Sequence, residues 1–156
     1  DDVQNDEENE FLPHKEARKV LLVAITSNKG LCGAFNTNVA KRIIQLTEEN
    51  FKTEYLNGEV DIICVGKKGY EILKGRRIKI AETHNDIFEA LSFEKVAKLA
   101  DSIMSSFKSG KYDLVHIVFN QFKNAAVQEL TTEQFLPVAL KPVKVSLEDR
   151  NTNYIL

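Results

Sequence analysis

The chain has little of several features that mark particular protein classes. Its 156 residues include only two cysteines, Cys32 and Cys64, which are too few for a disulfide scaffold and lack the spacing of a zinc site. We therefore expect a reducing, cytosolic compartment and no metal. No apolar run approaches the roughly 20 residues that a membrane helix needs.

The sequence also lacks a large excess of either positive or negative charge. Lys and Arg number 21 against 23 Asp and Glu, which gives a net charge of −2. Proteins that bind nucleic acids by neutralising phosphates usually carry a basic excess, so no nucleic-acid partner is expected. The first ten residues, DDVQNDEENE, hold six acids and one apolar residue. We expect residues 1–12 to be an acidic flexible linker, and the acidity argues against a signal peptide here.

The remaining composition is that of a soluble globular protein, with 43% hydrophobic and 28% charged residues. The length suits one domain with a substantial core. Residues 13–156 are therefore predicted to form a single globular domain.

Two apolar runs predict buried parallel strands, at residues 19–26 (KVLLVAIT) and 60–65 (VDIICV). The second run places Cys64 in the core. Between the two runs, an apolar stripe predicts a helix from Ala34 to about Phe51, capped by Asn36 or Thr37.

The second half alternates in the same way. We expect a short helix that opens at Gly66 and ends at Gly75, and then a strand near a sheet edge at residues 76–81 (RRIKIA). Apolar residues at helical spacing predict a helix over 93–107, started by Ser92 and stopped by Gly110. Strands at 112–119 and 126–131, joined by a short polar link, predict an antiparallel hairpin. From Leu136 onward the chain reads as a sheet-edge or wrapping segment.

These elements predict an α/β fold. Strands and helices alternate three times before the hairpin, which indicates three layers: a mostly parallel open sheet of about five strands, helices on both faces and an antiparallel edge hairpin. This architecture is Rossmann-like.

The loop after the first strand, Thr26–Gly33, is where such sheets usually hold ligands. Its residues do not match the glycine pattern of a dinucleotide-binding loop. Lys29 precedes the glycines, whereas the lysine of a phosphate-binding P-loop follows them. The glycines are better explained as room for a tight turn. A small-molecule or nucleotide-binding α/β enzyme using this loop is the alternative function.

Other chemistry is weakly supported. Cys32 could be a nucleophile, but no sequence feature places His14, His84 or His116 beside it. The carboxylates form no pair, so we predict no catalytic, cofactor-binding or metal-binding residue. A basic cluster is either a solvated face or a dock for an acidic protein surface; it comprises Lys67, Lys68, Lys74, Arg76, Arg77 and Lys79.

The stretch KVLLVAITSNKGLCGAFNTNV resembles the hallmark stretch of the gamma subunit of F-type ATP synthases, in which a strand runs into a GLCG loop and then a helix. The resemblance continues through DIICVGKKGYEIL, the helix at 93–107, YDLVHIVFNQFKNAAVQELTTEQFLPV and NTNYIL. It covers nearly the whole chain after about Glu10.

The resemblance implies a non-catalytic rotor component. Family members couple proton-driven rotation of the c-ring to ATP synthesis on the beta subunits, and this domain forms the foot of the rotor. The implied partners are the alpha, beta and epsilon subunits and the c-ring, with no homo-oligomer and no cofactor. The implied location is the cytoplasmic side of a bacterial inner membrane, peripheral and held through the complex.

Two sets of contact residues carry over from the family. The family loop faces acidic lever segments of the beta subunits, a charge that suits Lys29; it is matched here by Ser27, Lys29, Gly30, Leu31, Cys32, Gly33 and Asn36. Asn28 stands where an aspartate is common in the family. The segment near epsilon and the c-ring is matched by Tyr154, Ile155 and Leu156.

The sequence departs from the family in one large respect. Gamma subunits carry a long helix before this domain and another after it, wound into a coiled coil. The present sequence shows no sustained heptads. We therefore expect it to be the globular domain alone.

Overall fold

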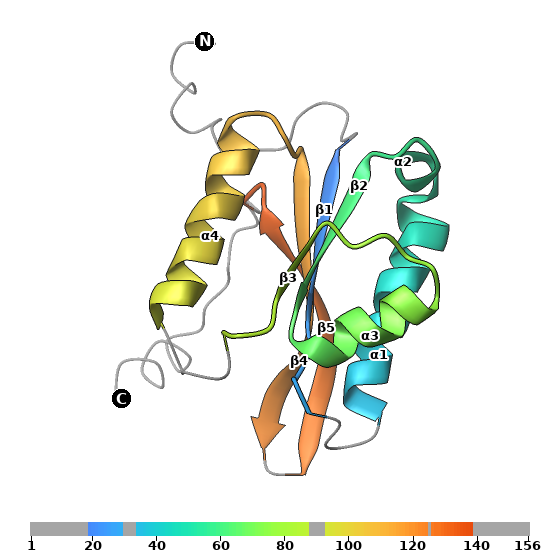
Figure 1. Ribbon diagram of the computed structural model, residues 1–156, viewed down its shortest axis with the longest axis vertical. Coiled ribbons are helices and arrows are strands. Elements are labelled where there is room, and N and C mark those ends of the chain that lie inside the picture. Colours follow the sequence, from blue (N-terminus) through green and yellow to red (C-terminus); the bar gives the residue numbers. More distant parts are fainter. Residues whose placement is uncertain (1–18, 30–33, 88–92, 125, 139–156) are drawn as a thin grey trace, which may run out of the picture.

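The computed structural model describes residues 19–29, 34–87, 93–124 and 126–138 (Figure 1). The elements follow in the order β1 (Val20–Ile25), α1 (Ala34–Gln45), η3 (Leu46–Asn50), α2 (Lys52–Leu56), β2 (Val60–Val65), α3 (Lys67–Gly75), β3 (Glu82–His84), α4 (Phe93–Lys108), β4 (Leu114–Asn124) and β5 (Val127–Leu136). The predicted linker at 1–12 lies outside the described residues. None of the helices in the described ranges has the length and apolarity to cross a bilayer.

The five strands form one sheet in the order β3-β2-β1-β4-β5. The first four are parallel, and β5 runs antiparallel to β4 at the edge. Helices α1 and α3 cover one face and α4 covers the other (Figure 1). The predicted three-layer α/β fold with an antiparallel edge hairpin is confirmed.

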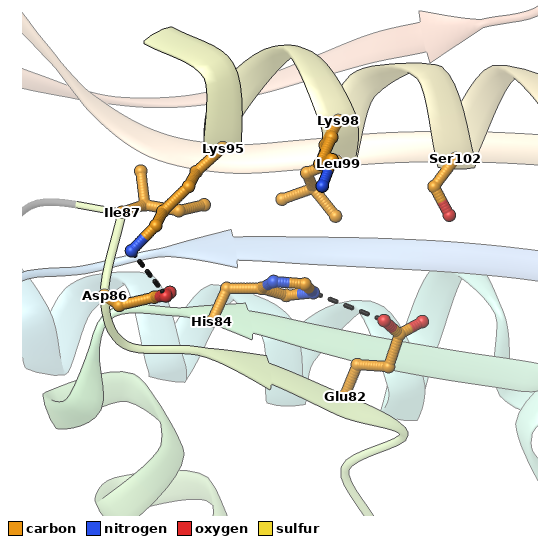
Figure 2. Close-up of a pocket in the computed structure, with 8 residues that line it drawn as sticks. All are labelled: Glu82, His84, Asp86, Ile87, Lys95, Lys98, Leu99 and Ser102. Carbon is orange, nitrogen blue, oxygen red and sulfur yellow. Dashed lines mark hydrogen bonds and ion pairs between the residues drawn. The ribbon is translucent and has the colours of Figure 1, made fainter. Parts of the chain in front are cut away.

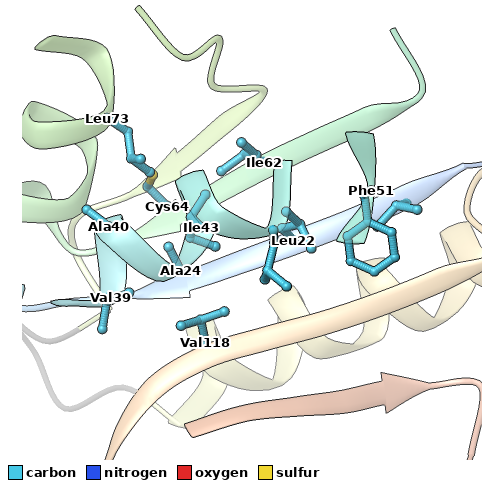
Figure 3. Close-up of a cluster of buried hydrophobic side chains, with 12 residues drawn as sticks. Leu22, Ala24, Val39, Ala40, Ile43, Phe51, Ile62, Cys64, Leu73 and Val118 are labelled. Carbon is cyan, nitrogen blue, oxygen red and sulfur yellow. The ribbon is translucent and has the colours of Figure 1, made fainter. Parts of the chain in front are cut away.

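One core cluster lies between β1, β2 and the helices α1 and α3 (Figure 3). Leu22 of β1 and Ile43 of α1 are fully buried there, and Leu73 closes the cluster from α3. Cys64 belongs to the same cluster, as predicted. Burying an aliphatic side chain of this size stabilises a fold by about 1.5–3 kcal/mol, so this layer fixes both helices on the sheet.

A second cluster lies under α4. Ile103 and Phe107 of α4 pack against Leu21 and Val115 of the sheet. The helix is confirmed, with its predicted stripe buried at Ile103 and Phe107 and exposed at Phe93 and Val96, and Gly110 follows it with φ +83°. Its predicted start at Ser92 lies outside the described residues.

The predicted strand at 76–81 is wrong. Arg77 has φ +62°, and the Ile78 N–H donates to the Leu73 carbonyl at 3.0 Å, so the chain turns back over the end of α3. The alternation arises because Ile78 and Ile80 pack on the core, whereas Arg77, Lys79 and Ala81 are exposed. The edge strand is the shorter β3, which pairs with β2.

Three other boundaries also differ. The α-helix from Ala34 ends at Gln45 and continues as the π-helical segment η3, and α2 is separate. Asn36 and Thr37 lie inside α1, so neither is its cap. The polar link between the hairpin strands is shorter than predicted because β4 extends to Asn124. The predicted end of α3 at Gly75 is confirmed, and the left-handed residue that follows the helix is Arg77.

Candidate functional site

The candidate site is the loop that follows β1, at the edge of the sheet where the parallel strands end. The structure describes it through Lys29 and again from Ala34. Four of the predicted contact residues lie outside the described residues: Gly30, Leu31, Cys32 and Gly33. The second predicted set, Tyr154, Ile155 and Leu156, also lies outside them.

The described part of the loop caps α3. The first N–H groups of a helix have no partner within the helix. Here the Lys67 N–H donates to Asn28 Oδ1 at 2.9 Å, and the Lys68 N–H donates to the Ser27 carbonyl at 3.0 Å. The Gly69 N–H donates to Thr26 Oγ1 at 2.8 Å. Three consecutive loop residues therefore satisfy three consecutive N–H groups of the first turn of α3.

Two glycines allow the loop and α3 to lie this close. A Cβ on Gly66 would lie 1.9 Å from the Thr26 carbonyl oxygen, and Gly66 has φ +94°, a conformation that favours glycine. A Cβ on Gly69 would lie 2.8 Å from Thr26 Oγ1. Only glycine fits at these two positions without a shift of the loop.

Asn28 uses both ends of its amide. Its Oδ1 accepts from Lys67, and its Nδ2 donates to the Asn85 carbonyl at 2.6 Å. An ionised aspartate could accept from Lys67 but could not donate to Asn85. The asparagine at this position therefore joins the β1 loop to the chain after β3 as well as to α3.

Asn36 holds the loop from the side of α1. The Ser27 N–H donates to Asn36 Oδ1 at 3.1 Å, and Asn36 Nδ2 donates to Ser27 Oγ at 2.9 Å. Asn36 is buried, whereas Ser27 and Lys29 are exposed. Of the predicted contact residues that the structure describes, Ser27 and Lys29 lie on the surface, and Asn36 lies behind them and positions the loop.

This hydrogen bonding limits what the loop can bind. Helix N-termini bind phosphates through unsatisfied N–H groups. The first three N–H groups of α3 and the N–H of Ser27 already donate within the protein. The described part of this edge therefore offers no phosphate cradle at α3.

The remaining candidates for chemistry are also occupied or dispersed. A cavity of about 190 Å³ beside β3 is lined by two pairs of polar side chains and by Ile87, Lys98, Leu99 and Ser102 (Figure 2). Lys95 lies 2.8 Å from Asp86 and, through that hydrogen bond above all, lowers the pKa of the Asp86 carboxyl; His84 lies 3.2 Å from Glu82. Among the described residues, no three His, Cys, Asp or Glu side chains are grouped as metal ligands.

The basic cluster divides into two parts. Lys67 and Lys68 lie 3.9 and 3.3 Å from Glu71, and Lys74 lies over the Tyr70 ring at 5.3 Å. The other three members are exposed and form no ion pair within the described part of the chain: Arg76, Arg77 and Lys79.

Sequence reasoning missed the capping role of Thr26, Ser27 and Asn28. A signal for it exists, because Gly66 stands at the N-cap of α3 and has no side-chain oxygen to offer. A helix with such a start needs its cap from another segment.

Comparison with known proteins identifies the family. A family model described as ATP synthase matches residues 1–156. The ATP synthase gamma chain of Flavobacterium psychrophilum is 42% identical over 153 residues, which is 98% of this chain and 51% of that protein. The chain belongs to the ATP synthase gamma-chain family. It spans about half the length of the curated gamma chains that it matches.

Solved structures agree with this family. The central stalk and c-ring structure of the mitochondrial ATP synthase of Tetrahymena thermophila contains the same fold, with a TM-score of 0.64 and 23% identity over 98% of this chain and 70% of that one. The rotor of the Euglena gracilis mitochondrial ATP synthase gives a TM-score of 0.59 and 26% identity over 89% of this chain and 49% of that one. The family predicted from the GLCG loop is confirmed.

Proposed function

We propose that this chain is the globular foot domain of the gamma subunit of an F-type ATP synthase. In this role it is a non-catalytic rotor component that couples proton-driven c-ring rotation to ATP synthesis on the beta subunits. The observation that carries the proposal is the capping of α3 by Thr26, Ser27 and Asn28. This capping uses the first N–H groups of α3 to hold the β1 loop, so these groups are not available to a phosphate.

A loop held in this way is suited to transmit force. Its residues form hydrogen bonds with Lys67 of α3, with Asn85 in the chain after β3 and with Asn36 of α1. It leaves the sheet from β1, the central strand, whose residues are almost completely buried. Because close-packed interiors have low compressibility, a load applied at the loop passes into the whole sheet.

The contact residues follow from this role. Ser27 and Lys29 present a polar, cationic surface to the acidic levers of the beta subunits, together with residues 30–33, while Asn36 positions them. Tyr154, Ile155 and Leu156 approach epsilon and the c-ring. The domain spans residues 13–156 after a linker at 1–12, and the assembly places it on the cytoplasmic side of a bacterial inner membrane, next to the alpha and beta subunits.

Binding to epsilon tests the foot role directly. The purified chain is expected to retain the epsilon subunit of the same organism in a pull-down assay and to hydrolyse no ATP alone. Failure to retain epsilon under conditions where the chain is folded would count against the proposal.

Nucleotide titration separates this role from the enzyme alternative. The amide signals of Gly30 and Gly33 are followed by NMR as ATP or ADP is added. No saturable shift is expected, and saturable micromolar binding would favour the small-molecule or nucleotide-binding enzyme.

The beta-facing role of Lys29 is tested in the complete complex. In a full-length gamma chain, Lys29→Glu is expected to lower ATP-driven proton pumping several-fold because it reverses the charge that faces acidic levers. Lys41→Glu makes the same charge change at an exposed position of α1 and is the matched control. Equal effects of the two variants would show that Lys29 is not part of the contact with the beta subunits.

A further inference from the structure

The basic cluster concentrates positive charge on an otherwise acidic chain. Six of the 21 Lys and Arg residues fall between Lys67 and Lys79, where Glu71 is the only acid. The rest of the sequence has 15 basic residues against 22 acidic ones. Lys67 and Lys68 lie beside Glu71, so their charge is partly compensated. The members without an ion pair in the described part of the chain form what we call the arginine surface: Arg76, Arg77 and Lys79.

The backbone of the arginine surface is fixed by hydrogen bonds on both sides. The Ile78 N–H donates to the Leu73 carbonyl at 3.0 Å, which holds the segment to the end of α3. The Ala81 N–H donates to the Ile62 carbonyl at 2.8 Å, which holds it to β2. Ile78 and Ile80 also pack on the core. The exposed cations are therefore presented on an ordered backbone, and ordering before binding reduces the entropy that binding costs.

Arg77 has a backbone conformation that suits glycine better than arginine. Its φ is +62°, and such conformations of other residues occur most often at functional sites. Gly75 stands only two residues earlier, yet the left-handed position holds an arginine. Within the described part of the chain, the guanidinium of Arg77 has no hydrogen bond or ion pair. The strained arginine is thus available to a partner.

The chemistry of the arginine surface indicates the ligand class. A guanidinium donates two parallel hydrogen bonds to a carboxylate or a phosphate, which an ammonium group does not. Arg76, Arg77 and Lys79 place three cations within four consecutive residues, a stretch of at most about 14 Å. This size suits two or three anionic groups.

The surrounding charge favours a small acidic partner. A membrane surface or a nucleic acid spreads its phosphates well beyond this stretch and would also meet carboxylates of this chain, such as the exposed Glu71 and Glu82. Charges act over about 8 Å at physiological ionic strength, so these neighbours would repel an extended polyanion. We propose that the arginine surface binds a short Asp- or Glu-rich segment of another protein, with Arg76 and Arg77 donating to its carboxylates.

The arginine surface is separate from the proposed contact at the β1 loop. That loop caps the first turn of α3, whereas the arginine surface follows its last residue. The nine residues of α3 span about 13 Å. The proposal therefore goes beyond the rotor role, and either can fail while the other holds.

A fluorescent oligoglutamate peptide tests the binding at low ionic strength. Two other probes are measured in parallel: a thymidine oligonucleotide of equal charge and vesicles of phosphatidylglycerol. The peptide is expected to bind saturably and more tightly than either of them. It should also shift the amide NMR signals of residues 74–81 more than those of any other described segment.

Charge reversal locates the contact. Arg77→Glu is expected to weaken peptide binding about fivefold, because it replaces a cation of the surface by an anion. Lys98→Glu makes the same charge change at an exposed position of α4, on the opposite face of the sheet, and is the matched control (Figure 1). It should change the affinity by less than about twofold. Amide signals outside residues 74–81 report that each variant is folded.

Two milder substitutions test the arginine itself. Arg77→Lys keeps the charge but loses the two-pronged donor, so it should weaken binding about twofold. Arg77→Gly relieves the left-handed conformation, so it should raise the midpoint of urea unfolding while it weakens binding about threefold. Opposite changes in stability and affinity would not arise if Arg77 served only the fold.

The contrary outcomes are equally specific. The proposal is overturned if the peptide does not bind saturably, or if the oligonucleotide or the vesicles bind more tightly, which would assign the surface to a nucleic acid or a membrane. An equal loss of affinity in Lys98→Glu would show that the peptide responds to net charge alone. Unchanged affinity in Arg77→Lys or Arg77→Gly would show that the arginine does not donate to the peptide.

Discussion

Gly69 donates its N–H to the Thr26 hydroxyl oxygen at 2.8 Å, and a Cβ on Gly69 would lie 2.8 Å from that same oxygen. The hydroxyl in turn lies 3.3 Å from the carbonyl oxygens of Val65 and Gly66. Thr26 is only 5% exposed, so its side chain has little room to move away. The cap of α3 and the absence of a side chain at Gly69 therefore depend on each other.

Gly69→Ala is expected to destabilise the fold. Overpacking of a buried site costs about 1–3 kcal/mol, which exceeds the roughly 1 kcal/mol that alanine gains over glycine in a helix. The free energy of unfolding, measured by urea denaturation, should fall.

Gly75→Ala is the matched control for that measurement. Gly75 lies in the same helix, and a Cβ there would meet nothing within 4 Å. The change should therefore stabilise the protein by up to about 1 kcal/mol. Similar stabilisation by both variants would show that the contact between the β1 loop and α3 is looser than described.

Arg77→Gly is expected to stabilise the fold. Arg77 occupies the left-handed position after α3. Its N–H donates to the Lys74 carbonyl at 3.0 Å, and the Ile78 N–H donates to the Leu73 carbonyl at 3.0 Å. Helices usually have glycine at this position, because a left-handed conformation costs other residues about 1–2 kcal/mol. Since glycine also loosens the unfolded chain, the net gain should be about 0.5–1 kcal/mol in thermal or urea unfolding.

Arg76→Gly removes the same charge one residue earlier. Arg76 has φ −94°, so glycine gains nothing there and should leave stability unchanged or lower it. If both arginine variants stabilise the chain, relief of charge repulsion is the cause and the backbone argument is wrong.

The elements that the sequence predicts best are those whose pattern reflects burial on both sides. β1 and β2 are continuous apolar runs because each lies in the interior of a parallel sheet under helices. The stripe at 93–107 predicts α4 from burial on one side, since residues that face the sheet recur at helical spacing.

Residues 76–81 show where such patterns mislead. Alternation reports which side chains are buried, and Ile78 and Ile80 are indeed packed on the core. It does not report whether the backbone between them pairs with a neighbouring strand.

The candidate site was predictable in place but not in its bonding. The end of β1 is where α/β sheets hold their functional loops, and the letters there identify the family. That Asn28 spans Lys67 and Asn85 depends on segments 39 and 57 residues away, so no local pattern predicts it. Asn36 was predicted as a contact or a cap; it lies inside α1, so it is not the cap, its amide holds Ser27, and its role as a contact stays a prediction.

Asn28→Asp tests the bridge between the β1 loop and the chain after β3. The carboxylate still accepts from the Lys67 N–H, but it cannot donate to the Asn85 carbonyl. A carboxylate oxygen would then face the Asn85 carbonyl oxygen, and the two repel each other. Losing one hydrogen bond of this kind should cost about 1 kcal/mol in the free energy of unfolding. Asn85→Ala, which keeps its backbone carbonyl, is the control and should cost less.

Cys64 is expected to resist thiol reagents in the folded protein. It is fully buried in the core, and that burial raises the pKa of its thiol to about 12. In a Cys32→Ser background, alkylation at pH 8 should be slow in buffer and fast in 6 M urea, because only unfolding exposes a thiolate. Rapid reaction in buffer would place Cys64 nearer the surface than described.

His116 is expected to make stability depend on pH. Its ring is half-buried beside Phe51, with ring centroids 5.5 Å apart, and its Nδ1 has no hydrogen-bond partner among the described residues. Burial lowers the pKa of His116 below the usual 6.5, and a hydrogen bond with the Glu133 backbone opposes that shift only in part. The folded protein therefore holds this proton less tightly than the unfolded chain does.

The sign of the pH effect follows from that difference. The contribution of His116 to stability is present above pH 6.5 and is lost as the pH falls through 6.5 toward the lower folded pKa. His116→Phe keeps a ring beside Phe51 but cannot take up a proton, so it should flatten the loss of unfolding free energy between pH 7 and pH 5. An NMR titration of the His116 ring should give a pKa below 6.5. If its pKa is above 6.5, the charged ring is stabilised in the folded state, and the variant should then steepen the loss rather than flatten it.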